Sequence, residues 1–122
     1  MKKYFKYFVL LFLLILPLEV FAVNISYYNQ GLKSFNDKNY NEAKYYFEKD
    51  IVFNTKNEKS YLYLSKISAI NKDNNQQKIY LDTILVLNPK NEEALYLKIL
   101  LNIDEGDFKK AQESNLVFAK VC

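Results

Sequence analysis

The 122-residue chain contains no histidine, no arginine and no tryptophan, and only two glycines, two prolines and one cysteine. Without histidine it lacks the commonest general base and metal ligand among the side chains. Without arginine it lacks the residue best suited to bidentate phosphate binding. Its two glycines, Gly31 and Gly106, cannot form a glycine-rich phosphate loop. We therefore expect a protein that is not an enzyme and that uses no cofactor and no metal.

The remaining reactive side chains favour the same interpretation. The single cysteine, Cys122, is the last residue and cannot form an internal disulfide. We expect an incidental thiol, with an intermolecular bridge as the alternative. The acidic pairs Glu92-Glu93 and Asp104-Glu105 fall where helices should start or turn, and acids there cap helices and complement the helix dipole.

The N-terminus has the pattern of a secretory signal peptide. Lys2, Lys3 and Lys6 form a positive segment, and residues 7–18 form an uncharged, mostly apolar run. The β-branched Val20 and the small Ala22 follow. We expect a signal peptide over residues 1–22 with cleavage after Ala22. The run is short for a hydrocarbon core of roughly 30 Å. We expect a protein that is periplasmic or secreted, in a bacterial cell envelope; an uncleaved N-terminal membrane anchor is the alternative.

Cleavage would leave a nearly neutral chain. Lysine supplies all 17 basic residues against 14 acids, and removal of three lysines and Glu19 leaves 14 − 13 = +1. Nucleic-acid binding needs clustered positive charge, so we expect no nucleic-acid partner. Membrane contact is expected only through an uncleaved N-terminal segment.

The chain after residue 23 repeats with a period of 34 residues, because similar stretches begin at Tyr27, Tyr61 and Leu95. Each unit has the apolar spacing of two helices around a polar turn. We expect helices at 25–36, 40–53, 58–71, 75–87, 91–103 and 107–121, and no strand. Capping boxes are expected for Asn39 with Glu42 and for Thr55 with Glu58.

This pattern resembles the tetratricopeptide repeat (TPR) family over residues 24–122. The matching residues are Tyr27, Gly31, Tyr40, Ala43 and Phe47; then Tyr61, Leu64, Leu81 and Asn88-Pro89; then Leu95, Gly106, Phe108 and Ala111. Gln77 replaces a small residue, and Asn115 replaces a large apolar one. The resemblance implies an all-α fold, an α-solenoid of about three helix-turn-helix repeats in a right-handed superhelix. The repeats would span 24–57, 58–91 and 92–122, as one domain whose third repeat is incomplete and uncapped.

The resemblance also implies a binding surface. In this family the first helix of each repeat lines a concave groove that holds a protein or peptide. Here the concave-face set would be Tyr28, Leu32, Phe35, Leu62, Lys66, Tyr96 and Leu100, and Lys59, Ala69, Glu93 and Ile103 would face the same groove. The family's clamp for C-terminal carboxylates is absent, since its places hold Tyr28, Leu32, Tyr63, Glu93 and Leu97.

A second candidate surface is the end of the array. The end-face set, Leu116, Val117, Phe118 and Val121, has no visible cover in the sequence. We expect a non-catalytic interaction module, an adaptor or assembly factor that binds another protein on the concave face. The alternative is a structural subunit that forms a homodimer, or assembles, through the end-face set. A weaker alternative is binding of a glycan through exposed tyrosines.

The aromatic residues of segment 39–54 divide between packing and solvent. Five rings occur there, at Tyr40, Tyr45, Tyr46, Phe47 and Phe53. At 100° per residue, Tyr40 and Phe47 share one helical face, and Tyr46 and Phe53 share a second. We expect four of the rings to pack and Tyr45 alone to be free.

Overall fold

A computed structural model describes Tyr4 and residues 26–122, and residues 26–122 form helices and turns without a strand. The helices are α2 (Tyr27–Asn36), α3 (Tyr40–Phe53), α4 (Glu58–Ile70), α5 (Asn74–Leu87), α6 (Glu92–Asp104) and α7 (Phe108–Val121). The largest departure from expectation is at α2, which begins at Tyr27 rather than at residue 25 because Ser26 caps it through the amide of Asn29.

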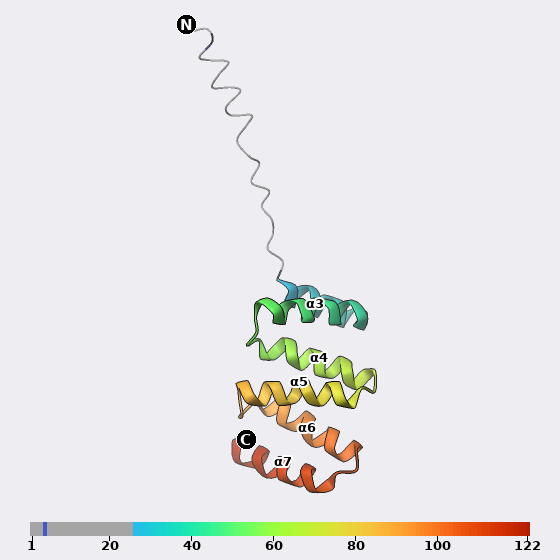
Figure 1. The fold of residues 1–122 in the computed structure, drawn as a ribbon, viewed down its shortest axis with the longest axis vertical. Coiled ribbons are helices and arrows are strands. Elements are labelled where there is room, and N and C mark those ends of the chain that lie inside the picture. Colours follow the sequence, from blue (N-terminus) through green and yellow to red (C-terminus); the bar gives the residue numbers. More distant parts are fainter. Residues whose placement is uncertain (1–3, 5–25) are drawn as a thin grey trace.

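Consecutive helices form pairs, and the pairs stack in chain order. α2 packs mainly on α3, α4 on α5 and α6 on α7, while α3–α4 and α5–α6 form the junctions between pairs. Figure 1 shows the pairs stacked along the long axis of the molecule. The expectation of an all-α solenoid of three helix pairs is confirmed.

The 34-residue period is also visible in the backbone of the turns inside each pair. Lys38, Lys72 and Gly106 all have positive φ, at 61°, 56° and 73°. The residue after each donates its amide to a carbonyl five positions earlier: Asn39 to Ser34, Asp73 to Ser68 and Asp107 to Asn102, at 2.8, 2.9 and 2.8 Å. The first helix of each pair thus ends in the same left-handed turn, although the three turn sequences differ.

The first pair crosses where the sequence has a small residue opposite a large one. Ala43 and Phe47 are fully buried, and a Cβ placed on Gly31 would lie 2.8 Å from the Phe47 ring. The same ring stacks on Tyr63 of the next pair, with centroids 5.0 Å apart and planes 7° from parallel. Phe47 therefore belongs to both the pair and the junction.

The expected capping boxes are wrong. The Asn39 side chain donates to Glu42 Oε2 at 2.9 Å and accepts no backbone N–H. At α4 the cap is Asn57, whose Oδ1 accepts the amide of Lys59 at 3.2 Å. Thr55 cannot be the N-cap of α4, because it lies two residues before the actual N-cap, Asn57.

Helix α7 is the least buried helix of the array. Ala111 is its buried residue, and the polar substitution Asn115 is exposed. In the preceding pair the equivalent position holds Leu81, which is fully buried, and Gln77 is accommodated with 6% exposure. The departure at Asn115 therefore coincides with the exposed outer side of α7, while α6 and α7 pack on each other as closely as the helices of the other pairs.

Candidate protein-interaction surfaces

The α2 members of the concave-face set are half-buried in an aromatic cluster. Tyr28 and Phe35 both contact Tyr63 of α4, with centroids 6.3 and 4.9 Å apart. Burial, and then the neighbouring Tyr63 and Asp50, raise the pKa of Tyr28. Leu32, between them on the helix, is also half-buried. These side chains join α2 to α4 and offer a partner only their outer edges.

The α4 members of the set behave differently from expectation. Leu62 is 7% exposed and packs in a core cluster with Leu81, Ile84, Ala94 and Leu101. It therefore belongs to the junction rather than to a free surface, because α6 covers the side of α4 on which it lies. Lys66 is partly exposed and forms an ion pair with Glu93 at 2.6 Å, with its ammonium group also 5.1 Å from the Tyr63 ring.

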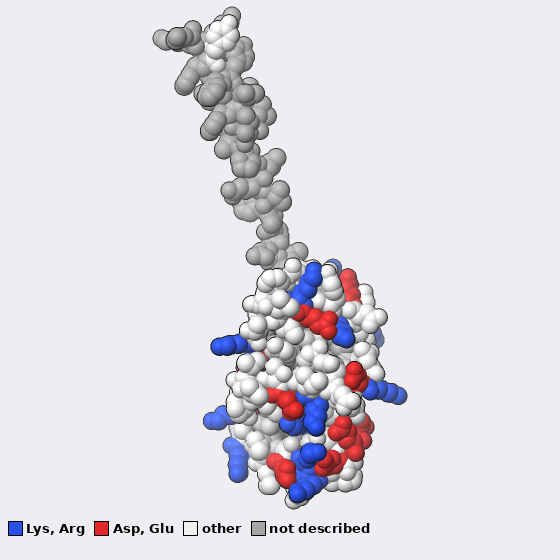
Figure 2. Space-filling view, in the orientation of Figure 1, with Lys and Arg blue, Asp and Glu red and all other residues white. Residues whose placement is uncertain are grey.

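The α6 members form the exposed apolar part of the concave face. Tyr96, Leu100 and Ile103 are 51%, 43% and 48% exposed. Their spacing of four and three residues places them on one side of the helix. This stripe lies next to the Lys66–Glu93 ion pair, so a contact surface here combines apolar area with one charge of each sign. On the face shown in Figure 2, lysines and acids are likewise interspersed over the helices.

The end-face set divides in the structure. Leu116 and Val117 are 58% and 45% exposed, whereas Phe118 and Val121 are half-buried. The equivalents of Leu116 one and two repeats earlier are Asp82 and Glu48. Asp82 forms an ion pair with Lys98 of the following helix at 2.6 Å. At α7 an apolar residue thus replaces the acid that, in the preceding repeat, is ion-paired with the next helix.

A third exposed surface lies at the other end of the array. Phe53 is 71% exposed, so the expectation that it packs is wrong. Its aromatic contact is the ring of Tyr27, the first residue of α2, which stacks on it with the two centroids 5.8 Å apart. Tyr45 is exposed as expected, with Lys49 4.5 Å above its ring and 5.3 Å from the ring of Tyr27. Hydrogen bonding to Tyr45 raises the pKa of Lys49.

Two polar clusters at the turns between pairs were missed by sequence reasoning. Asp50 is 1% exposed and accepts hydrogen bonds from Asn54, Asn57 and Ser60 at 2.9, 2.6 and 2.6 Å. One repeat later, Asn88 and Asn91 both donate to Glu58 Oε2, at 3.1 and 2.6 Å. The available signal was the repeated sequence Asn-x-Lys-Asn-Glu at 54–58 and 88–92.

These clusters fix how one pair is placed on the next. Asp50 joins the end of α3 to the start of α4, and Glu58 joins the start of α4 to the turn before α6. Beside the first cluster, Tyr28, Asp50, Phe53 and Lys56 line an open depression of about 620 Å³. Because its hydrogen bonds are satisfied within the chain, Asp50 acts here as a structural anchor.

No family model and no curated protein matches the chain. The signal peptide and its cleavage site after Ala22 lie outside the described residues. Across residues 26–122, none of the helices combines the length and the hydropathy needed to cross a membrane. The geometry therefore supports an all-α array of helix pairs whose described residues expose apolar side chains in the α6 stripe, on α7, at the Phe53 end and on α5, where Ile79 and Val86 are exposed.

Proposed function

We propose that the chain is an exported, non-catalytic TPR-like interaction module, an adaptor or assembly factor of a bacterial cell envelope. It binds another protein or an extended peptide on its concave face. Export is supported by the pattern of residues 1–22, and the family by the 34-residue period and the motif residues of each unit. The repeats are proposed at 24–57, 58–91 and 92–122.

The observation that carries the proposal is the exposed stripe of Tyr96, Leu100 and Ile103 on α6. Tyrosine buries a large area with few rotatable bonds and keeps a polar tip, which suits protein contacts. The adjacent Lys66 and Glu93 would fix the register of a partner through charge. The half-buried Tyr28 and Phe35 extend this surface toward α2.

Site-specific photocrosslinking in cells tests the concave face. A photoreactive amino acid at Tyr96 or Leu100 should give one discrete adduct, which mass spectrometry identifies. Ile79 on α5, which is 57% exposed, provides a matched control outside the concave-face set. Identical adducts from Ile79 and Tyr96, or none from Tyr96 and Leu100, would contradict the proposal. An adduct from Tyr96 that disappears in a Leu100→Asp background would support it.

A second candidate function is assembly through α7. The exposed Leu116 and Val117 support it, because an apolar surface at the end of a stack is suited to pairing with a second copy. Sedimentation velocity over a concentration series distinguishes it. A dimer that Leu116→Asp dissociates, while Val86→Asp on α5 does not, supports assembly; a monomer at all concentrations overturns it. Val86 is a suitable control because it is 82% exposed.

A further inference from the structure

A small groove lies between α5, α6 and α7, with a volume of about 280 Å³. Its lining from the second junction is Leu85, Pro89, Leu95 and Lys98, and its lining from α7 is Glu113, Ser114 and Val117. Its volume is just below the range of small-molecule sites, roughly 300–1,000 Å³. It can therefore hold one ring rather than an extended ligand. None of these residues belongs to the concave-face set.

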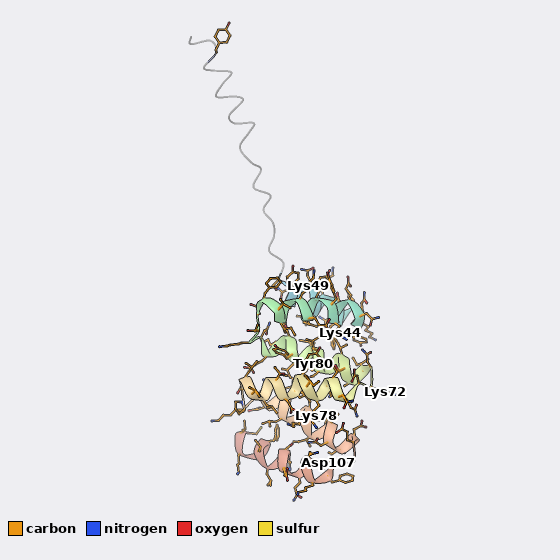
Figure 3. The ribbon with its side chains drawn as sticks, viewed as in Figure 1. Lys44, Lys49, Lys72, Lys78, Tyr80 and Asp107 are labelled. Carbon is orange, nitrogen blue, oxygen red and sulfur yellow. The ribbon has the colours of Figure 1, made fainter. Side chains whose placement is uncertain are left out.

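The corresponding place one repeat earlier is filled by the chain itself. There the rings of Tyr61 and Tyr80 lie 6.3 Å apart and pack with Ile51 in the first core cluster. The Tyr61 hydroxyl donates to the Thr55 carbonyl at 3.2 Å. Figure 3 shows Tyr80 extending from α5 toward α4. The first junction thus contains two phenol rings, one of which is anchored to the carbonyl of the turn.

At the second junction both rings are replaced by smaller side chains. Leu95 stands 34 residues after Tyr61, and Ser114 stands 34 residues after Tyr80. The backbone arrangement is retained, because the turns before α4 and α6 share the same sequence pattern and cap their helices with Asn57 and Asn91. The groove therefore lies where the first junction holds two tyrosine rings, and the buried Leu95 fills part of the place of Tyr61.

We propose that this groove binds a tyrosine side chain of a partner protein. Leu85, Leu95 and Val117 provide the apolar walls that an aromatic ring requires. The Pro89 carbonyl corresponds to the Thr55 carbonyl that accepts the Tyr61 hydroxyl. Further polar groups are Ser114, Glu113 and Lys98, which is ion-paired with Asp82. The groove opens to solvent, so a ring enters while its own backbone stays at the surface. Binding here is independent of the proposed concave-face function.

Methyl-detected NMR of the full 122-residue chain tests the proposal. The probe is N-acetyl-tyrosinamide, a tyrosine side chain on a neutral backbone, and the comparison is N-acetyl-phenylalaninamide. We expect saturable shifts at the methyl groups of Leu85, Leu95 and Val117. The tyrosine probe should bind roughly two- to tenfold more tightly, which is the effect of one net hydrogen bond. Equal affinities, or no saturable shift at these methyl groups, would overturn the proposal.

Two variants keep the result interpretable. Ser114→Tyr restores the ring found at Tyr80 and should abolish binding by filling the groove, whereas Gln112→Tyr on the exposed side of α7 should leave binding unchanged. If Ser114→Tyr does not fold, Val117→Glu changes a 45% exposed wall residue and should weaken binding. Binding of p-cresol without binding of N-acetyl-tyrosinamide would indicate a free phenolic ligand, and would also overturn the proposal.

Discussion

The Phe47 ring lies 2.8 Å from the position that a Cβ on Gly31 would occupy. The ring has little room to move, because it is fully buried and stacked on Tyr63. We predict that Gly31→Ala destabilises the chain by about 1–3 kcal/mol, as overpacking of a filled core does. Urea unfolding followed by far-UV circular dichroism measures the change. In a Phe47→Leu background the same substitution should cost less, and an equal cost would show that the ring is not the cause.

Gly106 gives a contrasting prediction, because its surroundings are open. No atom lies within 4 Å of a Cβ built there, but its φ is 73°. We expect Gly106→Ala to destabilise the chain by about 1 kcal/mol through backbone strain alone. Lys72 has φ 56° at the equivalent position, so Lys72→Gly should stabilise the chain by up to about 1 kcal/mol. Thermal unfolding tests both, and a destabilising Lys72→Gly would contradict this account of the turn.

The buried Asp50 cluster predicts a cost for losing its acceptor. Asp50→Leu would leave the donors of Asn54, Asn57 and Ser60 without their shared partner. We expect a loss of about 1–3 kcal/mol, since the buried Ser60 hydroxyl would then lack its acceptor. The control is Ile84→Leu, at the equivalent buried position of the next repeat, which should change stability by less than about 1.5 kcal/mol. Equal effects from the two variants would argue against a polar anchor at this junction.

Tyr80 predicts a response to alkaline pH. Burial raises the pKa of Tyr80 above the ordinary value near 10.0, since ionisation would place a phenolate among apolar groups. Its neutral form therefore contributes stability that is fully present below pH 10 and is lost as pH rises through the higher pKa of the folded state. We expect Tyr80→Phe to move the midpoint of alkaline unfolding to higher pH. The same change at exposed Tyr45 is the control, and an unmoved midpoint for Tyr80→Phe would contradict the prediction.

The helices and their pairing could be predicted from the sequence because turn chemistry and apolar spacing agree in every unit. Asn88 before Pro89 marks the end of α5, and Asn or Asp precedes every helix after α2. The 34-residue period then predicted which helices pair, since repeats of equal length stack on their neighbours in the same way.

The surface residues were harder to predict, because exposure depends on which neighbour covers each position. Leu62 and Lys66 are one helical turn apart, yet Leu62 enters the core while Lys66 reaches Glu93. Phe53 has the spacing of a packing residue, but Tyr27 is its aromatic contact. The hydrogen-bonded Asp50 was missed because an acid at a core position gives no sign of its partners until the turn is folded.

The first helices of neighbouring pairs, α2 with α4 and α4 with α6, are joined by different kinds of contact. Between α2 and α4 the contacts are the rings of Tyr28, Phe35 and Tyr63. Between α4 and α6 they include the Lys66–Glu93 ion pair and the hydrogen bonds to Glu58. Apolar contacts weaken on cooling, whereas exposed ion pairs weaken with added salt. Cold should therefore loosen the contacts near Tyr28, and high ionic strength the ion pair at Glu93, so that the two contacts respond to different conditions.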